Sequence, residues 1–245
     1  MKDYDALHEL WARAHSAGSP MKYVRNLVVY RELAELSPGK TLDAGCGTGE
    51  YSIFLARRGH DVTAFDPSPF ALKELLEKGG RQLGIRIEEN TIDGFSPDTE
   101  FDNIISIEVF EHLASDRKAI EKCRSLLKRG GSLVISVPAR PFLFSEADRV
   151  SGHFRRYTCA GFKKLLSGAG LREIRIISYG FPVLFLYSLL RKLFLDKLLI
   201  RHFASPSSKP GEKTAFLTRL YPYLLYADRL NIPFGGVGYV ASCKK

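Results

Sequence analysis

Cysteine is scarce in this sequence, and no two cysteines are spaced to suggest a metal site or a disulfide framework. The four cysteines among 245 residues stand far apart and form no Cys-x-x-Cys motif. This spacing excludes a zinc ribbon and a small disulfide-stapled scaffold. The first 15 residues contain acids and histidines where a secretory signal needs an unbroken apolar stretch. We therefore expect reduced thiols and a cytoplasmic protein.

Long apolar runs are also lacking. The longest stretch without a charged residue or histidine is Ile176–Leu190, whose 15 residues are interrupted by Gly180 and Pro182. A membrane-spanning helix needs about 20 apolar residues. We therefore expect no transmembrane helix.

The overall composition is that of a globular protein with an excess of positive charge. Hydrophobic residues make up 45% of the chain and charged residues 26%, and 36 Lys and Arg against 27 Asp and Glu give a net charge of +9. This composition excludes a wholly disordered or collagen-like chain. The charge permits an acidic partner such as phosphate, RNA or anionic lipid without choosing among them.

From Lys40 to about Tyr179, short β-rich runs alternate with helical patterns, which is typical of a parallel sheet with helices on both faces. The expected strands are Thr41–Ala44, Asp61–Phe65, Ile85–Glu88, Asp102–Ile107, Ser132–Val137, Glu173–Ser178 and Val237–Cys243. The expected helices are Glu50–Arg58, Pro69–Lys78, Ser115–Leu127 and Thr158–Ala169, with Thr158 as an N-cap and glycines such as Gly130 at helix ends. The predicted class is α/β.

Four segments follow from this pattern. Residues 1–37 are expected to form a helical cap, residues 38–180 the core, residues 181–235 a helical insertion and residues 236–245 the final strand. The apolar face of the cap is expected to run through Tyr23, Leu27, Tyr30 and Leu33.

The most informative segment is a glycine-rich turn between a strand and a helix. It reads Asp43-Ala44-Gly45-Cys46-Gly47-Thr48-Gly49, and Asp66 closes the next strand. Glycines let a ligand approach the backbone, and a carboxylate at the end of the second strand can bind two ribose hydroxyls. The pattern therefore predicts a nucleoside cofactor. The Gly-x-Gly-x-Gly spacing departs from the Gly-x-Gly-x-x-Gly of dinucleotide sites, which disfavours a nicotinamide dehydrogenase.

The segment resembles the first motif of the class I S-adenosylmethionine-dependent methyltransferases, and the resemblance covers about residues 40–179. It continues through the stretch from Phe101 to Leu113 and the stretch from Leu126 to Pro138. Within that superfamily the sequence looks most like the small-molecule group that includes the ubiquinone-biosynthesis O-methyltransferases. The resemblance implies a Rossmann-like fold with a mostly parallel sheet of seven strands.

The resemblance also implies roles for individual residues in binding S-adenosylmethionine, the donor that leaves as S-adenosylhomocysteine. The implied cofactor-binding residues are Asp43, Gly45, Cys46, Gly47 and Gly49 for the methionine moiety, Asp66 for the ribose, Pro67, Ser68, Ile92 and Asp93 for the adenine, and Glu108 beside the methionine end.

Two histidines are the candidate catalytic residues. His112 follows the fourth expected strand, and His153 lies in a stretch resembling an Asp-x(3)-Gly-His-x-Arg-Arg-Tyr element of the same group. An imidazole can act as the general base that takes a proton from the methyl acceptor. Arg156 and Tyr157 are candidate substrate-binding residues, although a brace between loop and sheet is an equal alternative. Glu108, Glu111 and His112 would also suit a divalent ion, but we expect no metal.

The predicted activity is methyl transfer to an oxygen or nitrogen of a small or lipid-linked molecule, and the alternative is a catalytically silent binding domain of the same fold. A nucleic-acid substrate is disfavoured, because the residues after the fourth strand lack the Asn/Asp-Pro-Pro-Tyr pattern of base methylation. Ten basic and three acidic residues lie between Tyr179 and Lys245, which is seven of the nine net positive charges. The basic and apolar segment 181–235 predicts peripheral membrane contact or a homodimer interface.

Overall fold

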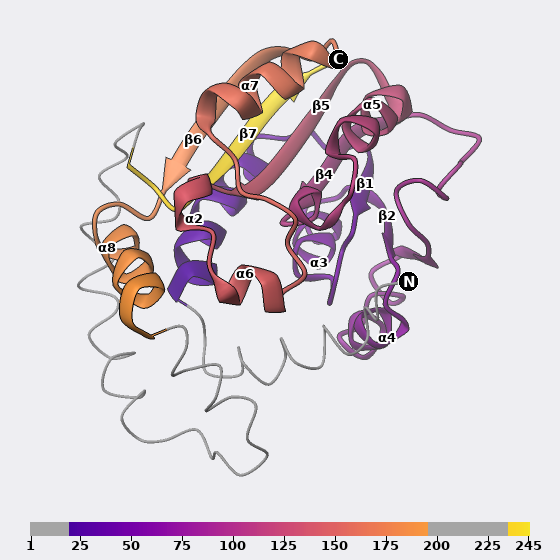
Figure 1. The fold of residues 1–245 in the computed structure, drawn as a ribbon. Helices are drawn as coiled ribbons and strands as arrows, with labels where there is room; N and C mark the ends of the chain where they lie inside the picture. Colours follow the sequence, from indigo (N-terminus) through magenta and orange to yellow (C-terminus); the bar gives the residue numbers. More distant parts are fainter. Residues whose placement is uncertain (1–19, 196–234) are drawn as a thin grey trace.

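The computed structural model describes residues 20–195 and 235–245, and its centre is a seven-stranded sheet in the order β3-β2-β1-β4-β5-β7-β6 (Figure 1). The strands are β1 (Lys40–Ala44), β2 (Asp61–Asp66), β3 (Arg86–Glu89), β4 (Phe101–Ile107), β5 (Leu127–Pro138), β6 (Arg172–Tyr179) and β7 (Gly238–Lys244). Only β7 runs antiparallel to its neighbours, β5 and β6. The predicted sheet and fold class are confirmed.

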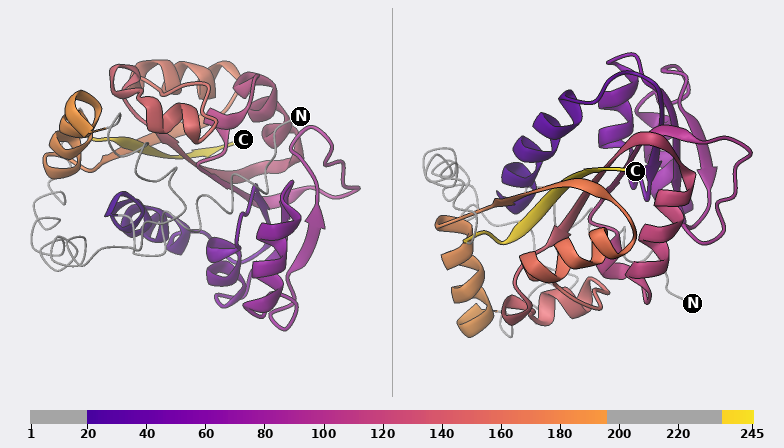
Figure 2. Two further views of the ribbon diagram at one scale, coloured as in Figure 1. Left: turned by 60° about the horizontal axis from the view of Figure 1, so that its bottom comes forward. Right: turned by 90° about the horizontal axis from the view of Figure 1, so that it is seen from above.

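Helices cover both faces of the sheet. They are α2 (Pro20–Ala34), α3 (Glu50–Ala56), α4 (Pro69–Glu77), α5 (Asp116–Leu126), α6 (Glu146–Val150), α7 (Cys159–Gly168) and α8 (Val183–Leu190), with short turns η1 (Phe110–His112), η2 (Pro141–Leu143) and η3 (Arg191–Leu195). Figure 2 shows α2, α3 and α4 on one side of the sheet and α5 and α7 on the other. Strands β1 to β5 all run in the same direction, so their carboxyl ends lie at one edge of the sheet. Ligands bind at this edge in open α/β sheets.

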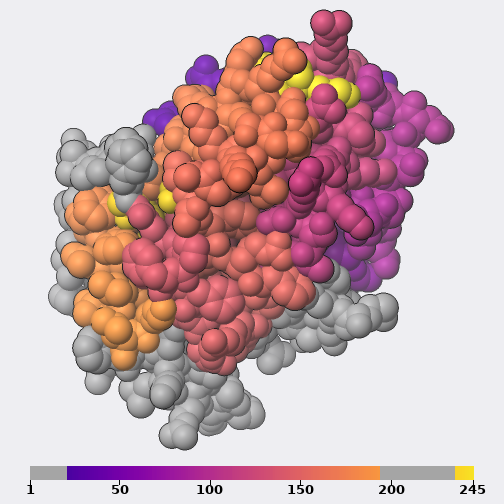
Figure 3. Space-filling model, turned by 45° about the horizontal axis from the view of Figure 1, so that its top comes forward, coloured from indigo at the N-terminus to yellow at the C-terminus, as the bar shows by residue number. Residues whose placement is uncertain are grey.

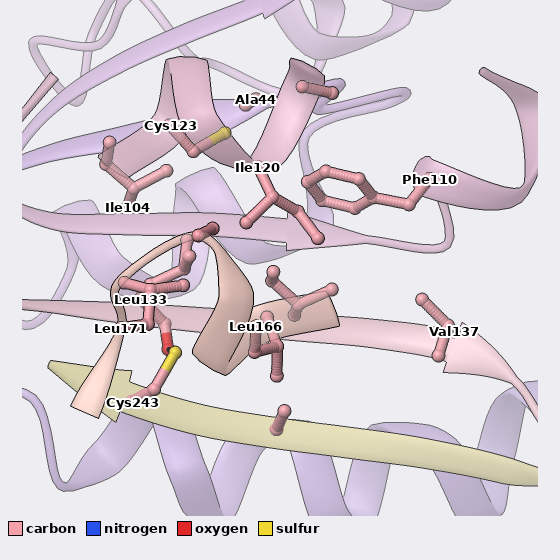
Figure 4. Packing of buried hydrophobic residues seen from close by; sticks show 14 of the residues in the cluster. Ala44, Ile104, Phe110, Ile120, Cys123, Leu133, Val137, Leu166, Leu171 and Cys243 are labelled. Atoms are coloured by element: carbon pink, nitrogen blue, oxygen red, sulfur yellow. Dashed lines mark hydrogen bonds between the residues drawn. The ribbon is translucent and has the colours of Figure 1, made fainter. Parts of the chain in front are cut away.

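The two faces of the sheet carry two separate apolar clusters. The first lies between the sheet and helices α5 and α7, where Ile104 and Leu133 from the strands meet Ile120 and Leu166 from the helices (Figure 4). The second lies beneath α2, α3 and α4. The central strands are buried on both faces, which explains their nearly continuous apolar sequences.

The beginnings of several helices follow from capping side chains. Ser68 accepts a hydrogen bond from the Ala71 N–H at 3.2 Å at the start of α4, and Thr158 accepts one from the Gly161 N–H at 3.0 Å at the start of α7. Such a cap satisfies one of the free N–H groups of the first turn. The predicted N-cap at Thr158 is confirmed.

The third helix ends within one residue of the predicted Leu127, but the expectation that Gly130 marks its end is wrong. Helix α5 ends at Leu126, and Leu127 already pairs with Phe101 as the first residue of β5. The next pair in this ladder is Asn103 with Ser132, so the residues between are bulged out of register. Gly130, which has a φ of +79°, serves this bulge rather than a helix C-cap.

The predicted apolar face of α2 is also partly wrong. Tyr23 is 51% exposed and Leu27 is 41% exposed, whereas Val24 and Val29 are buried with Leu33. The helix is rotated because polar side chains on its inner face bond to the core, as described below.

The structure describes only part of the predicted cap and of the predicted insertion. Residues 1–19 of the predicted cap and residues 196–234 of the predicted insertion lie outside the described residues. Helix α8 and the π turn η3 begin the insertion, and β7 supplies the predicted final strand. Within residues 20–195 and 235–245, no helix is long and apolar enough to cross a membrane.

Candidate active site

The glycine-rich turn lies at the carboxyl end of β1. Two of its glycines have conformations and surroundings that exclude a side chain. Gly45 has a φ of +78°, and a Cβ there would approach Val109 to 2.6 Å. Gly49, with a φ of +75°, would place a Cβ 2.1 Å from Leu75 Cδ1. The turn therefore stays open to a ligand only as glycine.

Asp66 closes β2 directly beside this turn. Its Oδ2 accepts a hydrogen bond from the Gly47 N–H at 2.8 Å, and its Oδ1 accepts one from the Ser68 N–H at 2.9 Å. A carboxylate has about four lone-pair sites and can accept several hydrogen bonds at once. Pro67 is half-buried between these two residues. The structure thus brings the predicted glycine turn and its acid together.

Asp43 lies at the buried side of the turn. Its Oδ2 accepts a hydrogen bond from the Ser52 hydroxyl at 2.5 Å. Burial raises the pKa of Asp43 to about 7, although the Ser52 bond opposes the shift. Burial also raises the pKa of the Cys46 thiol well above its usual range. Cys46 therefore belongs to the turn as a packed side chain and not as a nucleophile.

Two of the four predicted adenine contacts lie in the loop after β3. Ile92 is buried in the apolar cluster that also contains Phe95, and Asp93 is exposed to solvent. Phe95 in turn packs on Phe65 of β2, with ring centroids 4.7 Å apart. This packing fixes the loop beside the second strand, and adenine contact by Ile92 and Asp93 stays a prediction.

Glu108 follows β4 in a left-handed conformation with a φ of +57°. Its N–H donates to the Ser136 carbonyl at 3.0 Å, and its Oε1 accepts from the Ser136 hydroxyl at 2.6 Å. Arg25 Nη1 on α2 lies 3.5 Å from Glu108 Oε2. A non-glycine residue in this region is held there by its surroundings. Here the contacts with Ser136 of β5 and Arg25 of α2 hold Glu108 in this conformation.

Arg25 is a site residue that sequence reasoning missed. Its Nε is buried and has no hydrogen-bond partner among the described residues. A buried cationic donor without a partner fits the carboxylate of a bound ligand. The only available signal was the polar residues that interrupt the apolar pattern of α2.

The neighbouring polar residues of α2 fix this helix against the first turn of α3. Glu50 Oε1 accepts hydrogen bonds from Asn26 Nδ2 at 2.6 Å and from the Tyr30 hydroxyl at 2.9 Å, and Lys22 Nζ lies 2.7 Å from Glu50 Oε2. Burial alone would raise the pKa of Glu50, but the bonds from Lys22 and Tyr30 lower it below its ordinary value. The network places Arg25 beside the glycine turn.

The two predicted catalytic histidines meet beyond β4 and β5. The rings of His112, in η1, and His153, in the loop after α6, are 4.7 Å apart at their centroids and meet edge to face at 87°. The Phe154 N–H donates to the Glu111 carbonyl at 2.7 Å and joins the two segments. The structure thus brings the two histidines together, while their catalytic role stays a prediction.

The predicted substrate residues Arg156 and Tyr157 point into the protein. Arg156 Nε donates to Asp148 Oδ1 at 2.8 Å, and its Nη1 donates to the Ala139 carbonyl at 3.2 Å. The Tyr157 hydroxyl donates to Asp116 Oδ2 at 3.0 Å. These contacts fit the alternative in which both residues brace the loop against the sheet. They do not support contact of either residue with a substrate.

Glu111 lies in the short turn η1, next to His112. It is fully buried, and neither carboxylate oxygen has a hydrogen-bond partner within the described part of the chain. Burial, and then the charge of Glu108, raise the pKa of Glu111 well above its ordinary value. The charges of Arg25 and Arg156 lower the pKa of this carboxyl, but the larger effect of burial outweighs them. A ligand atom of Glu111 lies within 4.8 Å of one from His112 and one from His153.

The strand order, the glycine turn after β1 and the acid at the end of β2 define the class of this protein as a class I methyltransferase with a Rossmann-like sheet. Residues 21–176 match the family model described as "Methyltransferase domain", and the chain belongs to this family.

Curated relatives give the same assignment over part of the chain. Over 119 residues the chain is 34% identical to the mitochondrial ubiquinone biosynthesis O-methyltransferase of Schizosaccharomyces pombe, with 47% of this chain and 43% of that protein covered. It is 30% identical over 141 residues to the ubiquinone biosynthesis O-methyltransferase of Azotobacter vinelandii, covering 54% of this chain and 60% of the relative. The chain thus spans about half the length of these relatives.

Solved structures share the fold at low sequence identity. A phosphoethanolamine N-methyltransferase 2 of Haemonchus contortus, in complex with S-adenosyl-L-methionine, aligns with a TM-score of 0.62 at 16% identity, covering 90% of this chain and 52% of the other. An S-adenosylmethionine-dependent methyltransferase of Archaeoglobus fulgidus aligns with a TM-score of 0.59 at 19% identity, covering 97% and 99% of the two chains.

Proposed function

We propose that this protein is an enzyme that transfers a methyl group from S-adenosylmethionine to an oxygen or nitrogen of a small or lipid-linked molecule. One observation carries the proposal: the glycine turn and Asp66 follow the parallel strands β1 and β2, and the histidine pair follows β4 and β5, so both groups lie at the carboxyl edge of the sheet, where such folds bind ligands. Ubiquinone O-methyltransferases among the relatives support an acceptor of this kind.

The residues around the turn fit the cofactor. Asp66 would bind the ribose hydroxyls, with Pro67 and Ser68 near the adenine, and the glycine turn at Gly45 and Gly47 would receive the methionine moiety. Glu108 and Arg25, whose Nε has no hydrogen-bond partner among the described residues, would hold the amino and carboxylate groups of that moiety. When bound, the cofactor supplies an activated methyl group on a positively charged sulfur.

The chain supplies alignment and proton transfer. Holding an acceptor in line with a methyl group can contribute effective molarities of about 10⁵–10⁸ M. An acceptor that must lose a proton gains roughly a further 10²–10⁴-fold from a positioned general base. His153 and His112 are the bases within reach of the site. A divalent cation bound by Glu111 and the two histidines is an alternative use of the same cluster, because carboxylate and imidazole suit such ions.

Apolar side chains beside the site favour an acceptor with an apolar portion. Segment 139–157 and α8 lie side by side on the surface (Figure 3), joined by the rings of Phe142 and Phe185 at 6.2 Å. The exposed apolar side chains in this region are Phe142, Val150, Phe154, Leu186, Tyr187, Leu190 and Leu193. With the nearby cations Arg191 and Lys192, they support peripheral membrane contact, and a homodimer interface is the alternative. A cytoplasmic location stays a prediction.

Vesicle co-sedimentation separates these two uses of the surface. We expect the protein to pellet with vesicles of anionic phospholipid and less with neutral ones, and Leu186→Ser with Leu190→Ser to abolish the effect. The control replaces Tyr23 and Leu27, equally exposed on α2, with serine. Retained binding in the α8 variant would contradict membrane contact through this helix, and a concentration-dependent dimer lost in that variant would favour the homodimer.

Calorimetric titration with S-adenosylhomocysteine tests the cofactor assignment. We expect micromolar binding, weakened at least about tenfold by Asp66→Ala, and no binding of NAD. The matched control is Asp61→Ala, an exposed aspartate at the other end of the same strand, which should bind normally. Absence of binding to the unmodified protein would overturn the proposal. Binding without transfer of isotope-labelled methyl groups to any lipid or small-molecule extract would favour the silent alternative.

A further inference from the structure

Asp148 is the most extensively bonded side chain in the segment after β5. It is 2% exposed. Its Oδ2 accepts hydrogen bonds from the Ser145 N–H at 2.8 Å and the Ser145 hydroxyl at 3.1 Å. Its Oδ1 lies 2.8 Å from Arg156 Nε and 2.9 Å from His153 Nδ1. All four positions around the carboxylate therefore face a nitrogen or a hydroxyl.

These contacts determine which ring nitrogen of His153 carries the proton. Arg156 is permanently charged and its side chain is 5% exposed. The Ser145 N–H and Arg156 Nε, each 2.8 Å from a carboxylate oxygen, can only donate and so hold Asp148 as an ionised acceptor. An ionised carboxylate can only accept hydrogen bonds. The proton of a neutral His153 must therefore lie on Nδ1, and the lone pair must lie on Nε2.

The second ring nitrogen lies inside the site. His153 Nε2 is buried and has no hydrogen-bond partner among the residues that the structure describes. The ring stands edge to face with His112, and Glu111 contributes a ligand atom within 4.8 Å. Leaving a buried acceptor without a partner destabilises the folded protein. A hydrogen-bond donor on a bound methyl acceptor would satisfy His153 Nε2, which explains why this nitrogen is buried without a partner in the described part of the protein itself.

We propose that Asp148 is the positioning residue of His153: it fixes the Nδ1–H tautomer and so makes Nε2 the atom that receives the proton of the methyl acceptor. The inference rests on the proposed function. His153 takes this proton as a lone pair of the acceptor forms a bond to the methyl carbon, while the carbon–sulfur bond breaks and its electron pair stays on sulfur. The resulting imidazolium, with two N–H donors, remains bonded to the Asp148 carboxylate.

A purely structural role for Asp148 makes a different prediction. The carboxylate also caps α6 and neutralises Arg156, and loss of either contact would lower stability whatever the state of His153. The protonation state of the ring nitrogens distinguishes the two roles, because neither the cap nor the ion pair sets it. It also requires no methyl acceptor.

Nitrogen NMR of protein labelled with ¹⁵N-histidine measures this state directly. At about pH 8.5, roughly two units above the ordinary imidazole pKa, we expect the two-bond correlations of His153 to show a protonated Nδ1 and a bare Nε2. Its signals are assigned by their loss in His153→Gln. A bare Nδ1 in the unmodified protein would overturn the proposal whatever the variants do.

Two variants complete the test. Asp148→Ala removes the acceptor, so a substantial Nε2–H population should appear in protein that circular dichroism shows to be folded. Ser145→Ala removes one bond to Oδ2 but leaves Oδ1 in place, so it should keep the Nδ1–H form. Persistence of a pure Nδ1–H form in folded Asp148→Ala would contradict the proposal, and if that variant does not fold, the spectrum of the unmodified protein decides. Titration of the same samples with S-adenosylhomocysteine reports separately on the proposed function.

Discussion

Arg25 of α2 reaches to 3.5 Å from the carboxylate of Glu108, which follows β4 in a left-handed conformation. The contact joins the N-terminal helix to the edge of the sheet that carries the glycine turn. The Glu108 carboxylate raises the pKa of Arg25 above its usual range, although burial opposes the shift. A buried guanidinium with one orphaned N–H thus faces the place where the methionine end of the cofactor is proposed to bind.

Replacing Arg25 with glutamine should weaken the binding of S-adenosylhomocysteine by about 10- to 100-fold, because a buried charge-assisted hydrogen bond contributes roughly 1.5–3 kcal/mol. Isothermal titration calorimetry measures the effect. The control is Arg31→Gln on the same helix, whose guanidinium is largely exposed. Equal affinities for the two variants would remove Arg25 from the cofactor site.

The sheet could be predicted from the sequence because its signals are local. The central strands are short apolar runs bounded by glycine or by a helical pattern, and the turn at Gly45 follows its strand directly. The bulge at Gly130 was missed because glycine after a cationic helix end has the same sequence pattern as a C-cap. The face of α2 was misplaced for another reason: Tyr23 and Leu27 fit an apolar stripe, but the inward face is selected by the polar contacts of Arg25 and Glu50.

The candidate site, like the fold, could be predicted from the sequence only in part. Asp66 and its turn are linked by strand order, so their meeting was predictable from their positions. The burial of Tyr157 and the four bonds to Asp148 depend on how the loop after β5 folds back on the sheet, which periodicity does not report. Arg25 stands far from the motif in sequence, and only the docking of α2 brings it there.

Gly49→Ala should destabilise the protein by more than the backbone conformation alone requires. The position combines a φ of +75° with a Cβ that would lie 2.1 Å from Leu75 Cδ1. The matched control is Gly84→Ala, which has the same φ of +75° and nothing within 4 Å of its Cβ. The left-handed conformation costs each variant about 1–2 kcal/mol, and overpacking should cost Gly49→Ala roughly 1–3 kcal/mol more. Equal losses in urea unfolding would show that the contact with Leu75 relaxes freely.

Asp43→Asn should stabilise the folded protein increasingly as the pH rises. Burial raises the pKa of Asp43 to about 7, whereas an aspartate in the unfolded chain has a pKa of about 3.9. The folded protein therefore binds this proton more tightly, so stability is lost as the pH rises from about 4 to about 7. Asparagine cannot ionise, and its advantage at pH 8 over pH 5 should be on the order of 1–3 kcal/mol.

Thermal unfolding at the two pH values measures this difference. The control is Asp61→Asn, which replaces an aspartate exposed at the start of β2 and should show little pH-dependent advantage. A constant offset between Asp43→Asn and the unmodified protein across this range would mean that Asp43 is ionised throughout. The same variant should bind S-adenosylhomocysteine less tightly, because the turn then loses the negative charge beneath it.

His153→Gln should lower kcat for methyl transfer by roughly 10²–10⁴-fold, the contribution of a positioned general base. The affinity for S-adenosylhomocysteine should stay nearly unchanged, since His153 lies on the acceptor side of Glu111. The control, His60→Gln, replaces a histidine bonded to Thr41 at 2.8 Å between β1 and β2, and should affect stability more than kcat.

Chelation by EDTA distinguishes a base from a metal ligand. Full activity in EDTA, together with a large loss of activity in His153→Gln, would support His153 as a base. If EDTA instead abolishes activity and added divalent ions restore it, the cluster of Glu111, His112 and His153 binds a cation.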